Sequence, residues 1–394
     1  MNESILVKLK RVRLHDIGHC FLFLFAILPA LICRRFRPHL WLVCEENEAR
    51  DNGYWFFRYL REKQPQVDAL YAIGRDTPDY PTAAAAGPTV EYGSFRHWVY
   101  YLAAEVNISS QKKGKPNAAV CYLLEVLLGW LKNRRVFLQH GVIKDDLPFL
   151  HYEKTKMWFF CCGAKPEYEY IKSAFGYPEG SVYYTGLCRF DSLLQAEADD
   201  SLVLIVPTWR MYLQRNADPE AFLRSDYYRC WSSLLRDRAF SDLLREKGKR
   251  AVFCVHREMA EFESLFTSDF DNIRVMRWRE ADISSLIRRA GMLITDYSSV
   301  FMDFAYMKRP ILYFQFDREE FRARHLPKGY FDYDRDGFGP ICKTEEALLQ
   351  AAGSMMADMR VSAEYLRRIE AFYPLHDDHS CERTYQFIAA KLES

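Results

Sequence analysis

The sequence has 394 residues, of which 49% are hydrophobic and 27% charged, enough for the cores of two ordinary domains. Its 54 basic and 53 acidic side chains leave a formal net charge of +1, which excludes a global field directed at nucleic acid, so any anion site must be local. The eleven cysteines lie mostly in apolar runs and include no C-x-x-C pair, so we expect reduced core thiols rather than disulfides or a zinc site.

Residues 17–33 form a stretch of seventeen residues without a charged side chain. A membrane-spanning helix needs about 20 apolar residues, so this stretch is short, and Pro29 weakens it further. The segment also ends in a poor signal-peptide cleavage site. We expect a helix that lies on an anionic membrane surface, with a true span and a buried core helix as alternatives, because cations flank both ends: Lys8, Lys10, Arg11 and Arg13, then Arg34, Arg35 and Arg37.

The rest of the chain alternates between short apolar strands and helical patterns. One series of predicted strands spans residues 39–44, 67–73, 106–109, 136–139, 157–162 and 182–185. A second series spans residues 202–206, 251–256, 273–276, 292–295 and 311–314. Helical patterns between them cover residues 49–62, 117–131, 227–247, 282–289 and 298–307.

Strands separated by helical segments imply parallel sheets with helices on both faces. Residues 189–201 are typical of a hinge between two such sheets. The sequence therefore predicts an α/β fold with two Rossmann-like domains that face a cleft. The expected division is a membrane-associating segment at 1–37, a first domain at 38–195 and a second domain with terminal helices at 196–394.

Polar side chains follow the predicted strand 292–295, where Asp296-Tyr297-Ser298-Ser299 forms the turn into a helix expected to begin at Ser298. Ligands of open parallel sheets bind at the carboxyl ends of the strands. Hydroxyls there can cap the helix and can also hold an anion together with its free amides. An ordinary serine cap, with Asp296 as a turn residue, is the alternative.

Three further strand ends carry similar groups. His140 follows one strand of the first series, and a lone histidine there is more often structural than catalytic. Thr208 and Arg210 follow the first strand of the second series, and His256 ends the next. Because four strand ends carry groups that suit an anion, we expect a cleft that binds a phosphorylated ligand, with a histidine on each side.

These motifs resemble the CDP-glycerol glycerophosphotransferases of teichoic acid and capsule synthesis. The resemblance covers roughly residues 38 to 390 in consistent order. Its most specific part is Asp296-Tyr-Ser-Ser-Val-Phe-Met-Asp303-Phe-Ala-Tyr, followed by Lys308-Arg-Pro-Ile-Leu. The other matching pieces are Pro207-Thr-Trp-Arg210, His256, Gly186-Leu-Cys-Arg189-Phe-Asp191, Glu48-Ala-Arg50-Asp51-Asn52-Gly53 and Asp377-Asp378-His-Ser-Cys-Glu382-Arg383.

The resemblance implies two Rossmann-like domains of the GT-B type, with His140 as the catalytic base and His256 as a histidine on the donor phosphate. It implies that the second domain binds the CDP-alcohol through Thr208, Arg210, Asp296, Ser298, Ser299 and Asp303. On the acceptor side it implies Lys144, Arg189 and Asp191. Many family members continue the His-Gly motif with Thr-Pro-Leu-Lys, whereas this chain has His140-Gly-Val-Ile-Lys144, so the identity of the acceptor is in doubt.

The implied reaction moves an alditol phosphate from CDP-glycerol or CDP-ribitol to a hydroxyl of a lipid-linked saccharide or polymer, releasing CMP at the cytoplasmic face of the cell membrane. No carboxylate cluster has metal-site spacing and no cofactor is expected, although Asp296 or Asp303 could recruit magnesium. No nucleic-acid partner is expected.

Two other classes of function stay open: a glycosyltransferase that uses a nucleotide sugar, and a non-catalytic scaffold on a membrane surface. Lys112-Lys113-Gly-Lys115 is interpreted as an exposed loop, or as a contact for a lipid phosphate.

Overall fold

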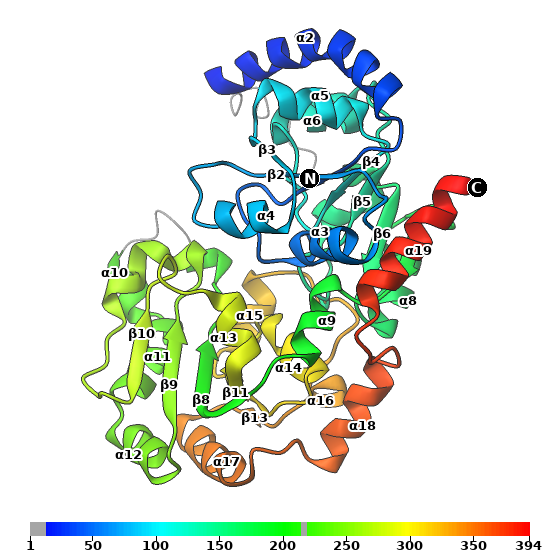
Figure 1. The fold of residues 1–394 in the computed structure, drawn as a ribbon. Helices are drawn as coiled ribbons and strands as arrows, with labels where there is room; N and C mark the ends of the chain where they lie inside the picture. The colour runs from blue at the N-terminus through cyan, green and yellow to red at the C-terminus, as the bar shows by residue number, and fades with distance from the viewer. Residues whose placement is uncertain (1–12, 214–218) are drawn as a thin grey trace.

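The computed structural model describes residues 13–213 and 219–394. It contains two parallel β-sheets with helices on both faces (Figure 1). The first sheet has the order β3-β2-β1-β4-β5-β6-β7, with strands β1 (Trp41–Cys44), β2 (Ala69–Ala72), β3 (Thr89–Val90), β4 (Val106–Ser109), β5 (Arg135–Phe137), β6 (Phe159–Cys162) and β7 (Val182–Tyr184). The second has the order β10-β9-β8-β11-β12-β13, with strands β8 (Asp199–Val206), β9 (Arg250–Cys254), β10 (Ile273–Met276), β11 (Ala290–Thr295), β12 (Ile311–Phe314) and β13 (Ile341–Cys342).

Helices connect the strands throughout. Those of the first half are α2 (Leu14–Phe36), α3 (Asn52–Lys63), α4 (Tyr80–Ala86), α5 (Phe95–Ala103), α6 (Ala118–Tyr122), the π-helical turn η1 (Leu123–Leu127), the 3₁₀ turn η2 (Pro148–Leu150), α7 (Tyr152–Thr155), α8 (Lys165–Ala174) and α9 (Cys188–Leu194). Those of the second half are η3 (Met211–Leu213), α10 (Pro219–Arg224), α11 (Asp226–Arg236), α12 (Arg238–Glu246), η4 (Arg257–Leu265), α13 (Ile283–Arg289), α14 (Val300–Tyr306), α15 (Arg318–Arg324), α16 (Tyr333–Asp336), α17 (Glu345–Asp358), α18 (Ala363–Phe372) and α19 (Ser380–Glu393).

The predicted alternation of strands and helices is confirmed, and every strand of both predicted series is present: β4, β10 and β12 have the predicted bounds, and the others have shifted ends. The prediction of one helix over residues 227–247 is wrong, because the chain breaks at Asp237, whose carboxylate accepts the Ala239 amide and caps α12. The predicted start of a helix at Ser298 is also wrong by two residues, since α14 begins at Val300.

Every residue of β1, β2, β4, β5 and β6 is buried, which explains why these runs form the inner strands of the first sheet. Aromatic side chains of α3 and the C-terminal helix α19 pack on one face of that sheet, and α5 and α6 pack on the other. All eleven cysteines are free, and eight of them are buried. Figure 1 shows α19 beside the first half of the chain, where it packs on α3 and α9.

Both sheets have a topological switch point, where the connections begin to run in the opposite direction. It lies between β1 and β4 in the first sheet, and between β8 and β11 in the second. Ligands of doubly wound folds bind just outside the carboxyl ends of the strands at such points. The loops after β1, β4, β8 and β11 are therefore the places where the fold itself favours a site.

The apolar N-terminal stretch is helical and lies on the outside of the first half of the chain, against α5 (Figure 1). Trp98 donates its indole N–H to His19, and Arg34 donates to the carbonyl of Ala103. By length and composition alone α2 could cross a membrane, a test that core helices and signal sequences also pass. Its outer face exposes large apolar side chains, Leu14, Ile17, Phe21, Leu24, Phe25, Ile27, Leu28, Leu31, Ile32 and Phe36. The flanking cations Lys8, Lys10 and Arg11 lie outside the described residues.

Candidate active site

A cavity of about 380 Å³ is lined by residues from both halves of the chain. Its wall is built by the segments that follow β4, β5, β8, β9 and β11, together with residues from α15 and the segment after it. The predicted site residues in this wall are His140, Lys144, Thr208, His256, Ser298 and Ser299. The other predicted site residues are not among its lining residues: Arg189, Asp191, Arg210, Asp296 and Asp303.

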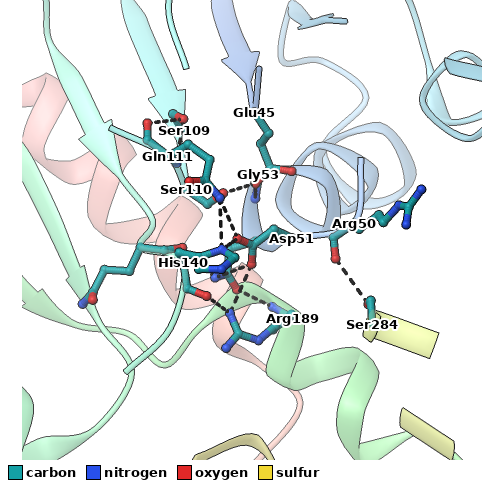
Figure 2. Close-up of polar contacts among 12 residues, drawn as sticks. Glu45, Arg50, Asp51, Gly53, Ser109, Ser110, Gln111, His140, Arg189 and Ser284 are labelled. Carbon is teal, nitrogen blue, oxygen red and sulfur yellow. Dashed lines mark hydrogen bonds and ion pairs between the residues drawn. The ribbon is translucent and has the colours of Figure 1, made fainter. Parts of the chain in front are cut away.

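His140 stands in the cavity wall with Asp51 directly behind it (Figure 2). The imidazole Nδ1 lies 2.5 Å from Oδ2 of Asp51 and 3.0 Å from the side-chain amide nitrogen of Gln111. A carboxylate at Nδ1 holds the proton on that nitrogen, which leaves Nε2 as the proton acceptor. The charge of Asp51 raises the pKa of His140 above its ordinary value. Asp51 is 7% exposed, whereas the His140 side chain keeps 72% exposure.

Arg189 joins this pair to the second half of the chain. Its NH1 donates to Asp51 at 3.1 Å and to the His140 carbonyl at 2.6 Å, while Nε and NH2 donate to the two carboxylate oxygens of Asp303 at 3.0 and 3.1 Å. Asp303 lies on α14, so the guanidinium links the histidine to the helix after the Asp296-Tyr-Ser-Ser turn. Both residues expected to contact substrates, Arg189 and Asp303, are therefore paired with each other.

Buried carboxylates also hold the loops around His140. Glu45, which follows β1, accepts the amides of Gly53 and Tyr54 and the hydroxyl of Ser110 (Figure 2). Burial and the nearby Asp51 raise the pKa of Glu45 to about 7. These contacts tie the start of α3, which carries Asp51 as its cap, to the loop after β4.

Arg210 is fully buried between two carboxylates. Its NH2 lies 2.8 Å from Asp296, and its Nε donates to Asp317 at 2.8 Å. The guanidinium also lies against the rings of Tyr227 and Phe321, each 4.9 Å away. Arg210 therefore holds the loops after β8 and β11 from behind and does not reach the cavity. Asp296 has the same supporting role, since its Oδ1 accepts the Thr208 amide.

His256 and two neighbours form an aromatic wall in the second half of the cavity. The Trp209 ring stacks on His256 with centroids 6.2 Å apart and meets His325 edge-on at 4.7 Å. Burial lowers the pKa of His256 to about 4, so the ring is neutral near pH 7. Because its Nδ1 accepts the Glu258 amide, Nε2 carries the proton and can donate to a ligand.

The two serines and Thr208 offer hydroxyls on the same side. Ser299 is exposed and caps α14 without a side-chain bond, and Ser298 accepts the Val300 amide only at 3.5 Å. The buried Oγ1 of Thr208 has no hydrogen-bond partner among the described residues. Because α14 has seven residues, support for an anion site here comes from these free polar atoms rather than from a helix dipole.

The remaining predicted residues have structural partners. Asp191 accepts the amides of Ser380 and Cys381 at the start of α19. Lys144 lines the cavity, but its ammonium pairs with Asp145, which also binds Arg322.

Within residues 13–213 and 219–394 no group of three or more His, Cys, Asp or Glu side chains could hold a metal ion. The two carboxylates considered for magnesium are paired with guanidiniums instead: Asp296 with Arg210, and Asp303 with Arg189. These residues therefore do not fit a magnesium site.

Three residues of the site were not assigned a role from sequence, Asp51, Gln111 and His325, and Lys112 was considered only as an exposed loop residue or a contact for a lipid phosphate. Asp51 and Gln111 are brought to His140 from 89 and 29 residues away, a contact that no local pattern encodes. Gln111 and Lys112 could have been predicted as site residues from their position just after the strand 106–109, because ligands bind at the carboxyl ends of parallel strands.

A family model described as CDP-Glycerol:Poly(glycerophosphate) glycerophosphotransferase matches residues 31–390. The minor teichoic acid biosynthesis protein GgaB of Bacillus subtilis (strain 168) is 26% identical over 374 residues, which are 89% of this chain and 40% of that protein. The teichoic acid poly(glycerol phosphate) polymerase of the same organism is 27% identical over 214 residues, 53% of this chain and 27% of that protein. The chain thus spans less than half the length of these relatives.

The solved structure of the wall teichoic acid polymerase TagF is similar in fold, with a TM-score of 0.66 and 16% identity. The match covers 99% of this chain and 99% of that chain.

Proposed function

The chain belongs to the CDP-glycerol:poly(glycerophosphate) glycerophosphotransferase family, and from that premise we propose that it transfers glycerol phosphate, or a related alditol phosphate, from a CDP-alcohol to a hydroxyl of a membrane-linked acceptor. The product would extend a teichoic acid or another surface polymer, and CMP would leave. The observation that carries this proposal is the cavity at the two switch points, to which the first half of the chain contributes the His140–Asp51 pair and the second half contributes His256, Thr208, Ser298 and Ser299. CMP release from CDP-glycerol by the purified protein with a membrane extract tests it.

His140 would act as the base. The acceptor hydroxyl attacks the phosphorus that carries glycerol, a new P–O bond forms, and the P–O bond to CMP breaks with its electron pair leaving on CMP. The hydroxyl proton passes to Nε2 of His140, while Asp51 stabilises the imidazolium that forms. Positioning of the two substrates supplies much of the remaining rate, as in other phosphoryl transfers.

The second half of the chain would hold the donor. The neutral His256 can donate its Nε2 proton to a phosphate oxygen, and the unpartnered Thr208 hydroxyl and the two serines can donate beside it. Fixed donors aimed at the charge that develops on the leaving CMP lower the barrier. Arg210 and Asp296 would act only by holding these loops, because both are fully buried.

Asp51→Asn is expected to lower turnover by about 10–10²-fold, part of the 10²–10⁴-fold that a base contributes. His140 accepts a proton only when neutral, so activity falls as the pH drops through its raised pKa. Without the Asp51 charge that pKa falls, and the acid limb of the pH–rate profile moves to lower pH. The exposed Asp76→Asn serves as the control. A reduced rate with an unmoved acid limb would leave Asp51 with a structural role only.

We further propose a GT-B arrangement, with a first domain over residues 38–195 for the acceptor and a second over residues 196–394 for the CDP-alcohol. Two parallel sheets with a cavity between their switch points support this division.

We also propose that the protein is peripheral on the cytoplasmic face of the cell membrane. The exposed apolar face of α2 supports that location, and Arg34 and Arg35 at the end of the helix suit an anionic surface.

Phe25→Glu together with Leu28→Glu is expected to lower partition onto anionic vesicles at least about tenfold, because two large apolar groups no longer enter the interface. Both side chains point outward, at 71% and 67% exposure, so the thermal unfolding of the protein should not change. Deleting the whole helix α2 is a poorer test, since it would expose the buried Trp98, which donates to His19 of that helix. Leu223→Glu with Phe387→Glu, two exposed apolar residues on other helices, adds the same charge as a control. Equal vesicle binding by both double variants would contradict the proposal.

A further inference from the structure

Two lysines line the cavity, and the structure gives them different partners. Lys144 is paired with Asp145, so its charge is already neutralised. Lys112 has no carboxylate in ion-pair distance among the described residues, and its ammonium donates to a single backbone oxygen, the Phe149 carbonyl at 2.8 Å. An ammonium group has three protons to donate, so Lys112 retains hydrogen-bonding capacity at the cavity wall.

The surroundings of Lys112 favour an anion. Its ammonium lies 5.8 Å from the ring centres of Tyr122 and of Phe149, and its side chain is half-buried. Burial, with smaller contributions from the nearby cations Lys115, Arg135 and Lys154, lowers the pKa of this lysine to about 8. A charged group in such a place costs free energy unless it gains a counter-charge, and a bound anion would supply one.

The loop that carries Lys112 is held firmly. A Cβ atom at Gly114 would lie 2.1 Å from the Cys44 carbonyl oxygen, so the loop passes too close to β1 for any other residue. Lys115 and Arg135 both pair with the buried Glu125, at 2.6 and 2.8 Å. The cations next to Lys112 are therefore engaged, and Lys112 is left as the cation of this loop that faces the cavity.

The position of Lys112 points to the acceptor. The preceding residue, Gln111, contacts the Nδ1 of His140, and both belong to the first half of the chain. The polar groups suited to the donor belong to the second half of the chain. An anion at Lys112 would thus lie on the same half of the cavity wall as His140, where the attacking hydroxyl is expected.

We propose that Lys112 forms a subsite for a phosphate group of the acceptor, next to the hydroxyl that His140 activates. This inference rests on the proposed function, which defines the acceptor as the membrane-linked molecule that receives the alditol phosphate. The phosphate can belong to the terminal unit of a glycerol phosphate chain or to the diphosphate of a lipid carrier, since both present the same anionic oxygens to an ammonium.

Binding of two probes to the intact protein tests the subsite: a soluble trimer of glycerol phosphate and, separately, farnesyl diphosphate in detergent. Calorimetry compares the wild type with Lys112→Gln, Lys112→Arg and Lys113→Gln. Lys113 is the exposed neighbour in the same loop and is the matched control. We expect Lys112→Gln to bind one probe about tenfold more weakly, as for a lost hydrogen bond to a charged group, and Lys112→Arg and Lys113→Gln to bind as the wild type does. The probe that responds identifies the source of the phosphate.

Equal affinity of the wild type and Lys112→Gln for both probes, or no binding of either probe by the wild type, would overturn the subsite. If Lys112→Gln also bound CDP-glycerol about tenfold more weakly, the subsite would be overturned as well, because Lys112 would then contact the phosphates of the donor. If Lys112→Gln does not fold, amine acetylation of the wild type decides: the bound probe should protect Lys112 but not Lys113, and absence of protection overturns the subsite. Failure of the proposed function is a separate result, since it appears as absence of CMP release from CDP-glycerol.

Discussion

His140→Ala is expected to lower turnover by about 10²–10⁴-fold while the affinity for CDP-glycerol is kept. The substitution removes the proton acceptor, which follows β5 of the first sheet, but the donor groups at His256, Thr208 and Ser298 follow strands of the second sheet. Single-turnover rates of CMP release measure the first effect, and calorimetry with CDP-glycerol measures the second.

His39→Ala is a suitable control for this experiment, because His39 is 79% exposed, pairs with Glu105 and lies before the start of β1, at the opposite end of the strand from the site. It should leave both quantities unchanged. Lost donor affinity in a folded His140→Ala protein would move the histidine to the donor site, and unchanged turnover would remove it from the mechanism.

Arg210→Met is expected to reduce the free energy of unfolding by about 3–5 kcal/mol, the usual cost of breaking a buried ion pair at one partner. The substitution leaves the carboxylates of Asp296 and Asp317 without their counter-charge in a place that water does not reach. Urea denaturation followed by circular dichroism gives the size of the loss.

Arg58→Met provides the comparison, since Arg58 forms an exposed pair with Glu62 one helical turn away and such pairs contribute at most about 1 kcal/mol. A loss for Arg210→Met no larger than that of Arg58→Met, combined with weaker CDP-glycerol binding, would show that Arg210 contacts the donor instead of supporting its loops.

The alternation of strands and helices could be predicted because most strands are short apolar runs bounded by polar segments. Every residue is buried in β1, β2, β4, β5, β6, β11 and β12. The two-residue strands β3 and β13 could not, since Thr89–Val90 and Ile341–Cys342 are too short to show a period. The break at Asp237 was missed because an apolar helical period continues on both sides of it.

The strand-end rule placed His140, His256, Thr208 and the two serines in one cavity wall, although their chemical roles stay predictions. It could not tell which polar residues at strand ends face the ligand and which face each other. Arg189 and Asp303 are 114 residues apart in the sequence and form a bidentate pair. Such pairing depends on the packing of α9 against α14, which a single sequence does not display.

The choice of donor tests the account most directly. Purified protein and a membrane extract are mixed with CDP-glycerol, CDP-ribitol or a UDP-sugar, and release of CMP or UMP is followed by chromatography, with His140→Ala as the inactive reference. The proposed function predicts CMP release from a CDP-alcohol that depends on His140, and no UMP release from UDP-sugars. UMP release from a UDP-sugar with both CDP-alcohols untouched would contradict it and favour a glycosyltransferase.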